Sequence, residues 1–225
     1  VLRNRSVAMR MGATRMPGLV GNVTIPKQTA GATAYWLANE GTAITEGALT
    51  FGQVALSPKT VGAYVEVSRL LMLQSSPAAE SIVTADLAQQ VALAADLAVL
   101  HGSGSAGQPT GITATGSIGS VTGTSLDYAD ILEFQSDVAT ANVQPNAGGY
   151  VTTPAVAALL MARQRFSSTD TPLWTGNLWD GQMAGFRAMS SNQVTAASMI
   201  FGDWSQVVVG EWGVLEVSLN EQANF

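Results

Sequence analysis

The sequence contains no cysteine, one histidine and only two lysines among its 225 residues. Without cysteine, the chain has no disulfide, no thiolate metal site and no cysteine nucleophile. The single histidine, His101, excludes a histidine-rich metal site, and any catalytic triad would have to use it. We therefore expect no metal, no cofactor and no enzyme.

Charged residues are also scarce. They make up 12% of the chain, whereas an average soluble domain carries about 25%. Hydrophobic residues reach 47%, yet no unbroken apolar run approaches the roughly 20 residues that span a bilayer. We therefore expect no membrane partner, and a surface largely buried against other subunits explains the composition most simply. The net charge of −6 argues against tight binding of nucleic acid.

The most regular segment is a helix predicted over residues 77–101. Ser76 suits its N-cap, Pro77 suits its first position, and Gly102 suits its end. One helical stripe of apolar residues follows the start: Val83, Leu87, Val91, Ala94 and Ala98.

Two shorter helices are predicted further along, over residues 125–140 and 154–165. Because helices and strands do not alternate regularly, the sequence predicts an α+β fold rather than a βαβ array. The segments typical of strands are residues 23–25, 35–37, 51–56, 63–68, 150–152, 199–201, 207–209 and 215–219.

Residues 21–62 are rich in glycine, threonine and alanine and show no helical periodicity. A two-sided hairpin of this composition has too few large apolar residues for a core of its own. We expect it to lie on another part of the assembly, and a second subunit fits this need.

Gly102 to Gly107 match the G-x-G-x-x-G pattern of dinucleotide sites, but a helix rather than a strand precedes them. A flexible connector is the simpler interpretation. His101 close to Ser103 and Ser105 leaves a small serine hydrolase as an alternative, although no nucleophile-elbow sequence surrounds these serines.

Two groups of like charge have more than one interpretation. The acids of the second helix are most simply a solvated face, and a neighbour's arginines or a metal ion are the alternatives. The N-terminal arginines suit a neighbouring subunit better than nucleic acid, because the chain is acidic overall. The acids are Asp127, Asp130, Glu133 and Asp137, and the arginines are Arg3, Arg5, Arg10 and Arg15.

The order of these segments resembles the Hong Kong 97-type capsid family of tailed phages. The resemblance covers nearly the whole chain and rests on several short segments in the same order. They are Arg3 to Val7, Trp36 to Lys59, Val67 to Leu71, His101 to Ile112, Pro172 to Trp174 and Ile200 to Trp204.

The resemblance implies the α+β Hong Kong 97-type capsid fold, which has a peripheral domain with a long spine helix, an axial domain and an extended β-hairpin loop. It divides the chain into an N-terminal arm, the extended loop, the peripheral domain with the spine helix, the axial domain, and a return to the peripheral domain. These parts are residues 1–21, 22–62, 63–108, 109–210 and 211–225.

The resemblance also implies a function. The chain is expected to be a major capsid protein of the virion, assembled in the host cytoplasm into hexamers and pentamers of an icosahedral shell around packaged double-stranded DNA. A scaffold segment, a portal and a decoration protein are the other implied partners. An encapsulin-type compartment is the alternative within the same fold. Inter-subunit contacts are expected from Arg3, Arg5, Trp36, Glu40, Ile44, Glu46 and Phe51.

Some members of this family carry a loop lysine that forms an isopeptide bond with an asparagine of a neighbouring subunit. Ile44 stands in the place of that lysine, and the acceptor asparagine would fall after Phe225. We therefore expect a non-covalent shell, and we expect this sequence to be part of a longer chain.

Overall fold

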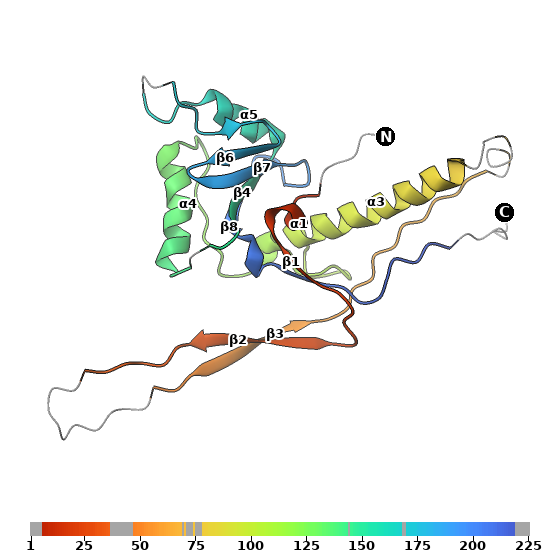
Figure 1. Cartoon of the computed structure of the whole chain (residues 1–225), viewed down its shortest axis with the longest axis horizontal. Helices are drawn as coiled ribbons and strands as arrows, with labels where there is room; N and C mark the ends of the chain where they lie inside the picture. The colour runs from red at the N-terminus through yellow and green to blue at the C-terminus, as the bar shows by residue number, and fades with distance from the viewer. Residues whose placement is uncertain are drawn as a thin grey trace. The chain divides into compact units, whose positions relative to one another are not determined.

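The computed structural model describes residues 6–36, 47–68, 70, 74, 78–143, 145–167 and 170–218. The chain divides into two compact units, one formed by residues 17–58 with 210–213 and the other by the rest. Figure 1 labels the elements of both units, and each unit is described by itself.

The smaller unit is a two-stranded antiparallel hairpin of β2 (Val23–Ala30) and β3 (Thr50–Leu56). Val23 is paired with Leu56, Lys27 with Gly52, and the register shifts between Gln28 and Ala30. None of the described residues of this unit is buried. The prediction of a hairpin without its own core is therefore confirmed.

The larger unit contains the long helix α3 (Ala78–His101). Glu80 lies in its first turn, where a carboxylate complements the helix dipole. The expected N-cap Ser76 and first helical residue Pro77 lie outside the described residues. Four residues of the predicted stripe are half-buried, but Ala94 is exposed, and the buried residues near the C-terminal end are Asp96 and Leu100.

α3 is also long and apolar enough to cross a bilayer on length and composition alone, over Glu80–His101 with mean hydropathy 1.4. This criterion averages hydropathy over a window, whereas the sequence of α3 contains no unbroken apolar run of that length, because Asp86 and Asp96 interrupt it. The core helix of a soluble protein passes the same test but is mostly buried, whereas only 6% of this window is buried.

A five-stranded sheet forms the centre of the larger unit, in the order β5-β6-β7-β4-β8. The β4–β7 pair is parallel, and the other pairs are antiparallel. Its strands are β4 (Gly148–Thr152), β5 (Thr175–Gly176), β6 (Asp180–Met183), β7 (Phe186–Ser190) and β8 (Met199–Asp203).

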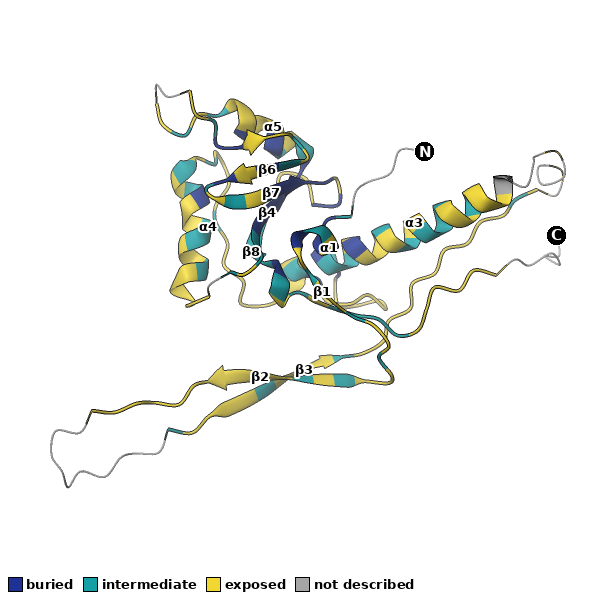
Figure 2. Ribbon diagram, viewed as in Figure 1, coloured by how far each residue is buried: buried dark blue, intermediate teal, exposed yellow. Residues whose placement is uncertain are grey.

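Two apolar clusters bury opposite sides of β4, because neighbouring residues of this strand belong to different clusters. In Figure 2 the strand is dark blue, the colour of buried residues. Tyr150 packs with Ile131 of α4 (Tyr128–Thr140) and Leu160 of α5 (Pro154–Ala162). Val151 instead packs with Leu100 of α3 and with α1 (Ala8–Met11). This two-sided burial places the C-terminal end of α3 against the sheet.

Short elements complete this part of the chain. β1 (Thr14–Met16) pairs with β9 (Val208–Gly210), and two 3₁₀ turns are η1 (Ile112–Ala114) and η2 (Trp204–Gln206). Trp204 of η2 is buried, and its indole N–H donates to the Gly149 carbonyl at 3.0 Å.

Several predicted boundaries are wrong for physical reasons. α4 begins after Asp127 rather than at residue 125, because that aspartate caps it, and α5 ends at Ala162 because Arg163 is extended. The described residues of 35–37, 63–68 and 215–219 are not strands. Residues 63–68 alternate as a strand does, but a strand also needs a hydrogen-bonded neighbour.

Candidate functional site

The arrangement around His101 does not support a hydrolase. The hydroxyl of Ser103 lies 3.1 Å from that of Ser105 and 3.3 Å from the amide oxygen of Gln108. The imidazole of His101 instead contacts Thr113 and Thr195. A general base must reach the proton that it removes, so the serine hydrolase alternative has no nucleophile–base pair here.

The acids of α4 have a structural explanation. The Asp127 side chain accepts hydrogen bonds from the backbone N–H groups of Ala129 and Asp130 at 2.8 and 3.1 Å. The Asp130 carboxylate accepts from the N–H of Asp127 at 2.8 Å, which completes a capping box. Among the described residues, no cluster of histidine, aspartate and glutamate could hold a metal ion.

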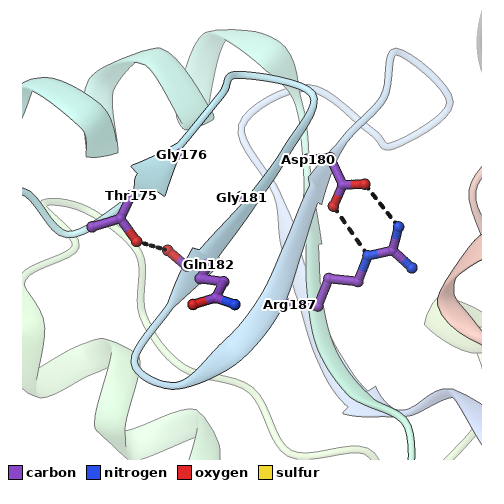
Figure 3. A pocket seen from close by; sticks show the side chains of 6 residues that line it. All are labelled: Thr175, Gly176, Asp180, Gly181, Gln182 and Arg187. Atoms are coloured by element: carbon purple, nitrogen blue, oxygen red, sulfur yellow. Dashed lines mark hydrogen bonds and ion pairs between the residues drawn. The ribbon is translucent and has the colours of Figure 1, made fainter.

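A shallow pocket of about 560 Å³ lies beside β5, β6 and β7 (Figure 3). Its charges are already matched, because Arg187 donates from Nε to one Asp180 oxygen at 3.0 Å and from a terminal nitrogen to the other at 2.8 Å. The hydrogen bond with Asp180 raises the pKa of Arg187. Arg187 also donates to the Arg10 carbonyl at 2.7 Å, which ties α1 to the sheet. The lining residues are Thr175, Gly176, Asp180, Gly181, Gln182 and Arg187.

Asp96 anchors the beginning of α1 to α3. Its side chain is only 5% exposed, and its oxygens accept from the Ser6 hydroxyl at 3.0 Å and from the N–H groups of Val7 and Ala8 at 3.0 and 2.9 Å. Sequence reasoning missed this role. The available signal was an aspartate in the apolar run Ala94 to Leu100.

The hairpin has exposed apolar side chains on both faces. Cross-strand pairing puts Ile25 opposite Val54 on one face and Phe51 opposite Gln28 on the other. Phe51 is 69% exposed, and Trp36, beyond the end of β2, is fully exposed. The remaining expected contact residues, Arg3, Arg5, Glu40, Ile44 and Glu46, lie outside the described residues.

The larger unit also exposes apolar residues that sequence reasoning did not select. Tyr64 and Val214 lie in extended segments, and Leu159 and Trp179 lie on α5 and in the turn before β6. Large apolar side chains exposed on several elements mark a protein that associates.

Known proteins similar to this chain are also ones that assemble, as their names state. The model of the phage capsid family matches residues 1–225. The major capsid protein of Halomonas phage phiHAP-1 is 35% identical over 224 residues, covering 98% of this chain and 36% of that protein. The major capsid protein of Klebsiella oxytoca phage phiKO2 is 23% identical over 255 residues, covering 100% of this chain and 56% of that protein. The chain thus spans between a third and three fifths of these relatives.

Solved structures give the same answer for the fold. The capsid of an empty GTA particle has a TM-score of 0.74 and 18% identity, covering 97% of this chain and 80% of that chain. A structure from Mycobacterium phage Adephagia has a TM-score of 0.66 and 15% identity, covering 93% of this chain and 72% of that chain. The predicted α+β Hong Kong 97-type capsid fold is confirmed.

Proposed function

Because the chain belongs to the phage capsid family, we propose that it is a major capsid protein whose copies assemble into an icosahedral shell. The observation that carries this proposal is the hairpin of β2 and β3, in which no described residue is buried. A two-stranded hairpin of this kind is marginal in water. A neighbouring subunit that covers it supplies the missing apolar contact.

The proposal assigns a role to each part of the chain. Residues 1–21 are the arm, 22–62 the extended loop laid on a neighbour, 63–108 the peripheral domain, 109–210 the axial domain and 211–225 the return to the peripheral domain. The separate unit of residues 17–58 supports the loop assignment. The two clusters that meet on β4 support a rigid body around which subunits pack.

The same proposal extends to the partners. The copies form hexamers and pentamers, and the shell confines packaged double-stranded DNA rather than binding it tightly. A scaffold segment, a portal and a decoration protein act during or after assembly. The role is structural and not enzymatic, with assembly in the host cytoplasm and no membrane.

Among the proposed contact residues, Trp36 and Phe51 are the ones that the structure describes. A large aromatic side chain that is exposed in one subunit and buried in the next gives the kind of anchor that dominates interfaces. The two residues project from a unit without a core, so their apolar surface has no other cover within that unit.

Expression of the full-length protein, followed by electron microscopy and sedimentation, tests the proposal. The unmodified protein should form closed shells or capsomers. Trp36→Ala and Phe51→Ala should each cost about 2 kcal/mol or more per contact. Their shell yield should therefore fall, while the melting temperature of unassembled subunits should not change.

Trp36→Phe and Tyr35→Phe are matched controls, because each keeps an aromatic ring in the same segment. Both should assemble nearly as well as the unmodified protein. A monodisperse monomer under assembly conditions would contradict the shell. Shells that form equally well with Trp36→Ala and Phe51→Ala would contradict the assigned contacts.

A further inference from the structure

His101, the last residue of α3, holds together three segments of the larger unit. Its Nε2 atom accepts the backbone N–H of Thr195 at 3.0 Å. Its Nδ1 atom lies 3.0 Å from the hydroxyl oxygen of Thr113 in η1. The imidazole therefore links the end of the spine helix to η1 and to the loop that leads into β8.

The partners determine where the proton lies. A backbone N–H can only donate, so Nε2 must carry a lone pair when it binds Thr195. The Thr113 hydroxyl donates to the Leu100 carbonyl at 3.1 Å, so its oxygen is left to accept from Nδ1–H. Both bonds are satisfied together only by a neutral ring with its proton on Nδ1.

No charged group on the adjoining segments opposes or favours protonation of this ring. Residues 103–114 and 191–198 contain no titratable side chain. On α3 the nearest acid is Asp96, whose oxygens are occupied by Ser6, Val7 and Ala8. The carbonyls at the C-terminal end of α3 favour a cation, but burial lowers the pKa of His101 below its usual 6.5.

We propose that His101 is a proton-sensitive clasp that holds the 191–198 loop to the end of α3 when neutral and releases it when protonated. A second proton on Nε2 would make this atom a donor that faces the N–H of Thr195, which is also a donor, so their hydrogen bond would be lost. The Thr195 hydroxyl, 3.3 Å from Nε2, is the acceptor to which the charged ring then turns. The loop thus exchanges a backbone bond for a weaker side-chain contact.

Release matters because this loop is part of the core. Val194 belongs to the cluster that also contains Leu100, Val151 and Trp204. The Ser198 carbonyl, at the other end of the loop, accepts from the Thr152 hydroxyl of β4 at 2.8 Å. The Ser191 N–H, at the first end, donates to the Thr152 carbonyl at 2.9 Å. Protonation therefore loosens the middle of a segment that joins the spine helix to the sheet, while both of its ends stay bound to β4.

Hydrogen exchange read by mass spectrometry on the full-length protein tests the clasp. The rate of hydrogen exchange at the Cε1 atom of the imidazole, measured against pH, gives the pKa of His101. No other histidine of these 225 residues contributes to this signal. As the pH falls from about 8 to about 5, the amide protection factor of a peptide covering 191–198 should drop. The midpoint of this drop should coincide with the imidazole pKa, and a peptide covering β4 should keep its protection.

Two variants separate the clasp from general acid sensitivity. His101→Gln offers an uncharged amide acceptor and should keep the loop protected at both pH values. His101→Phe offers no acceptor and should lose the protection at both. An unprotected loop at neutral pH, a midpoint that differs from the imidazole pKa, or the same pH-dependent loss in His101→Gln would each overturn the proposal.

Discussion

At the scale of single residues, Asp203 organises the junction of β8, β4 and η2. Its carboxylate accepts from the Ser205 hydroxyl at 2.7 Å and from the backbone N–H groups of Ser205, Ala147 and Asn146 at 3.0, 3.1 and 3.3 Å. Burial alone would raise the pKa of Asp203, but these four hydrogen bonds together lower it. The charged form therefore stabilises the fold.

This shift predicts an acid-sensitive contribution to stability. A lowered pKa in the folded state means that the contribution is complete above the ordinary value of 3.8 and is lost as the pH falls below it. Asp203→Asn should reduce the free energy of unfolding by about 1–3 kcal/mol at neutral pH and should flatten its acid dependence. Urea unfolding over a pH series measures both, and Glu133→Gln on the exposed side of α4 is the control.

Tyr150 gives a second prediction at this scale. Its hydroxyl donates to the Ile131 carbonyl at 2.9 Å and accepts from the Gln135 amide at 3.0 Å, and burial raises its pKa to about 12. Tyr150→Phe should lower the free energy of unfolding by about 1 kcal/mol. In the unmodified protein, stability should also fall as the pH rises from 10 towards 12, since only the unfolded state ionises easily there. Alkaline unfolding curves of the two proteins should differ in this range.

At the scale of elements, the three longest helices were predicted, apart from some of their ends, because their signals are local. Thr153 and Pro154 begin α5 as expected, with the Thr153 hydroxyl accepting from the Val156 N–H. The five-stranded sheet could not be predicted in the same way. Its order places β7 beside β4 and β4 beside β8, and such pairings depend on contacts between distant residues that no short pattern encodes.

The candidate site was predicted only in part, for the same reason. Trp36 and Phe51 were found because large aromatics are conspicuous in a segment rich in small residues. Asp96 and Thr195 were missed because their roles arise from partners about ninety residues away in the sequence. A lone carboxylate in an apolar helix is a signal that a partner exists, but not of which partner it is.

The link between α1 and α3 leads to a prediction about the arm. Asp96→Ala leaves the N–H groups of Val7 and Ala8 without their acceptor, and a buried unsatisfied donor costs about 1–3 kcal/mol. Residues 6–11 should detach locally. Limited trypsin digestion should then cut faster after Arg10 and Arg15 than in the unmodified protein.

Glu133→Gln is again the matched control, because it removes a carboxylate from an exposed helical position. It should leave the cleavage rate unchanged. Equal cleavage rates in Asp96→Ala and the unmodified protein would show that the cluster around Val7, Met11 and Leu100 holds the arm without the carboxylate.

At the scale of the whole molecule, the composition predicts how the shell is held together. The two lysines of the sequence are Lys27 and Lys59, on β2 and just after β3. From the resemblance we expect Ile44 to stand in the place of the lysine of the cross-linking family members, and we expect neither of these two lysines to replace it. Particles boiled in detergent should therefore run as single-chain bands. A ladder of multimers that disappears with Lys27→Arg or Lys59→Arg would contradict a non-covalent shell.

The charge of the molecule predicts its behaviour towards DNA. Ten cations against sixteen acids neutralise few phosphates, and each neutralised phosphate contributes about 0.9 to the slope of log affinity against log salt. Free subunits should bind duplex DNA weakly, with a shallow slope in an anisotropy titration. Tight binding with a steep slope would contradict this prediction and would indicate that the arginines of the N-terminal arm bind DNA.

Both units are closed by residues from opposite ends of the described chain. The closing hydrogen bonds run from the Thr14 N–H to the Val207 carbonyl, from the Leu19 N–H to the Glu211 carbonyl, and from the Trp212 indole to the Gly21 carbonyl. A nascent chain whose residues 207–212 are still inside the ribosome cannot close either unit. Contacts between residues so far apart in sequence also form slowly. Translation therefore delays the closing of both units, and neighbouring chains on one messenger cannot associate through a completed hairpin base before residues 207–212 of each chain have left the ribosome.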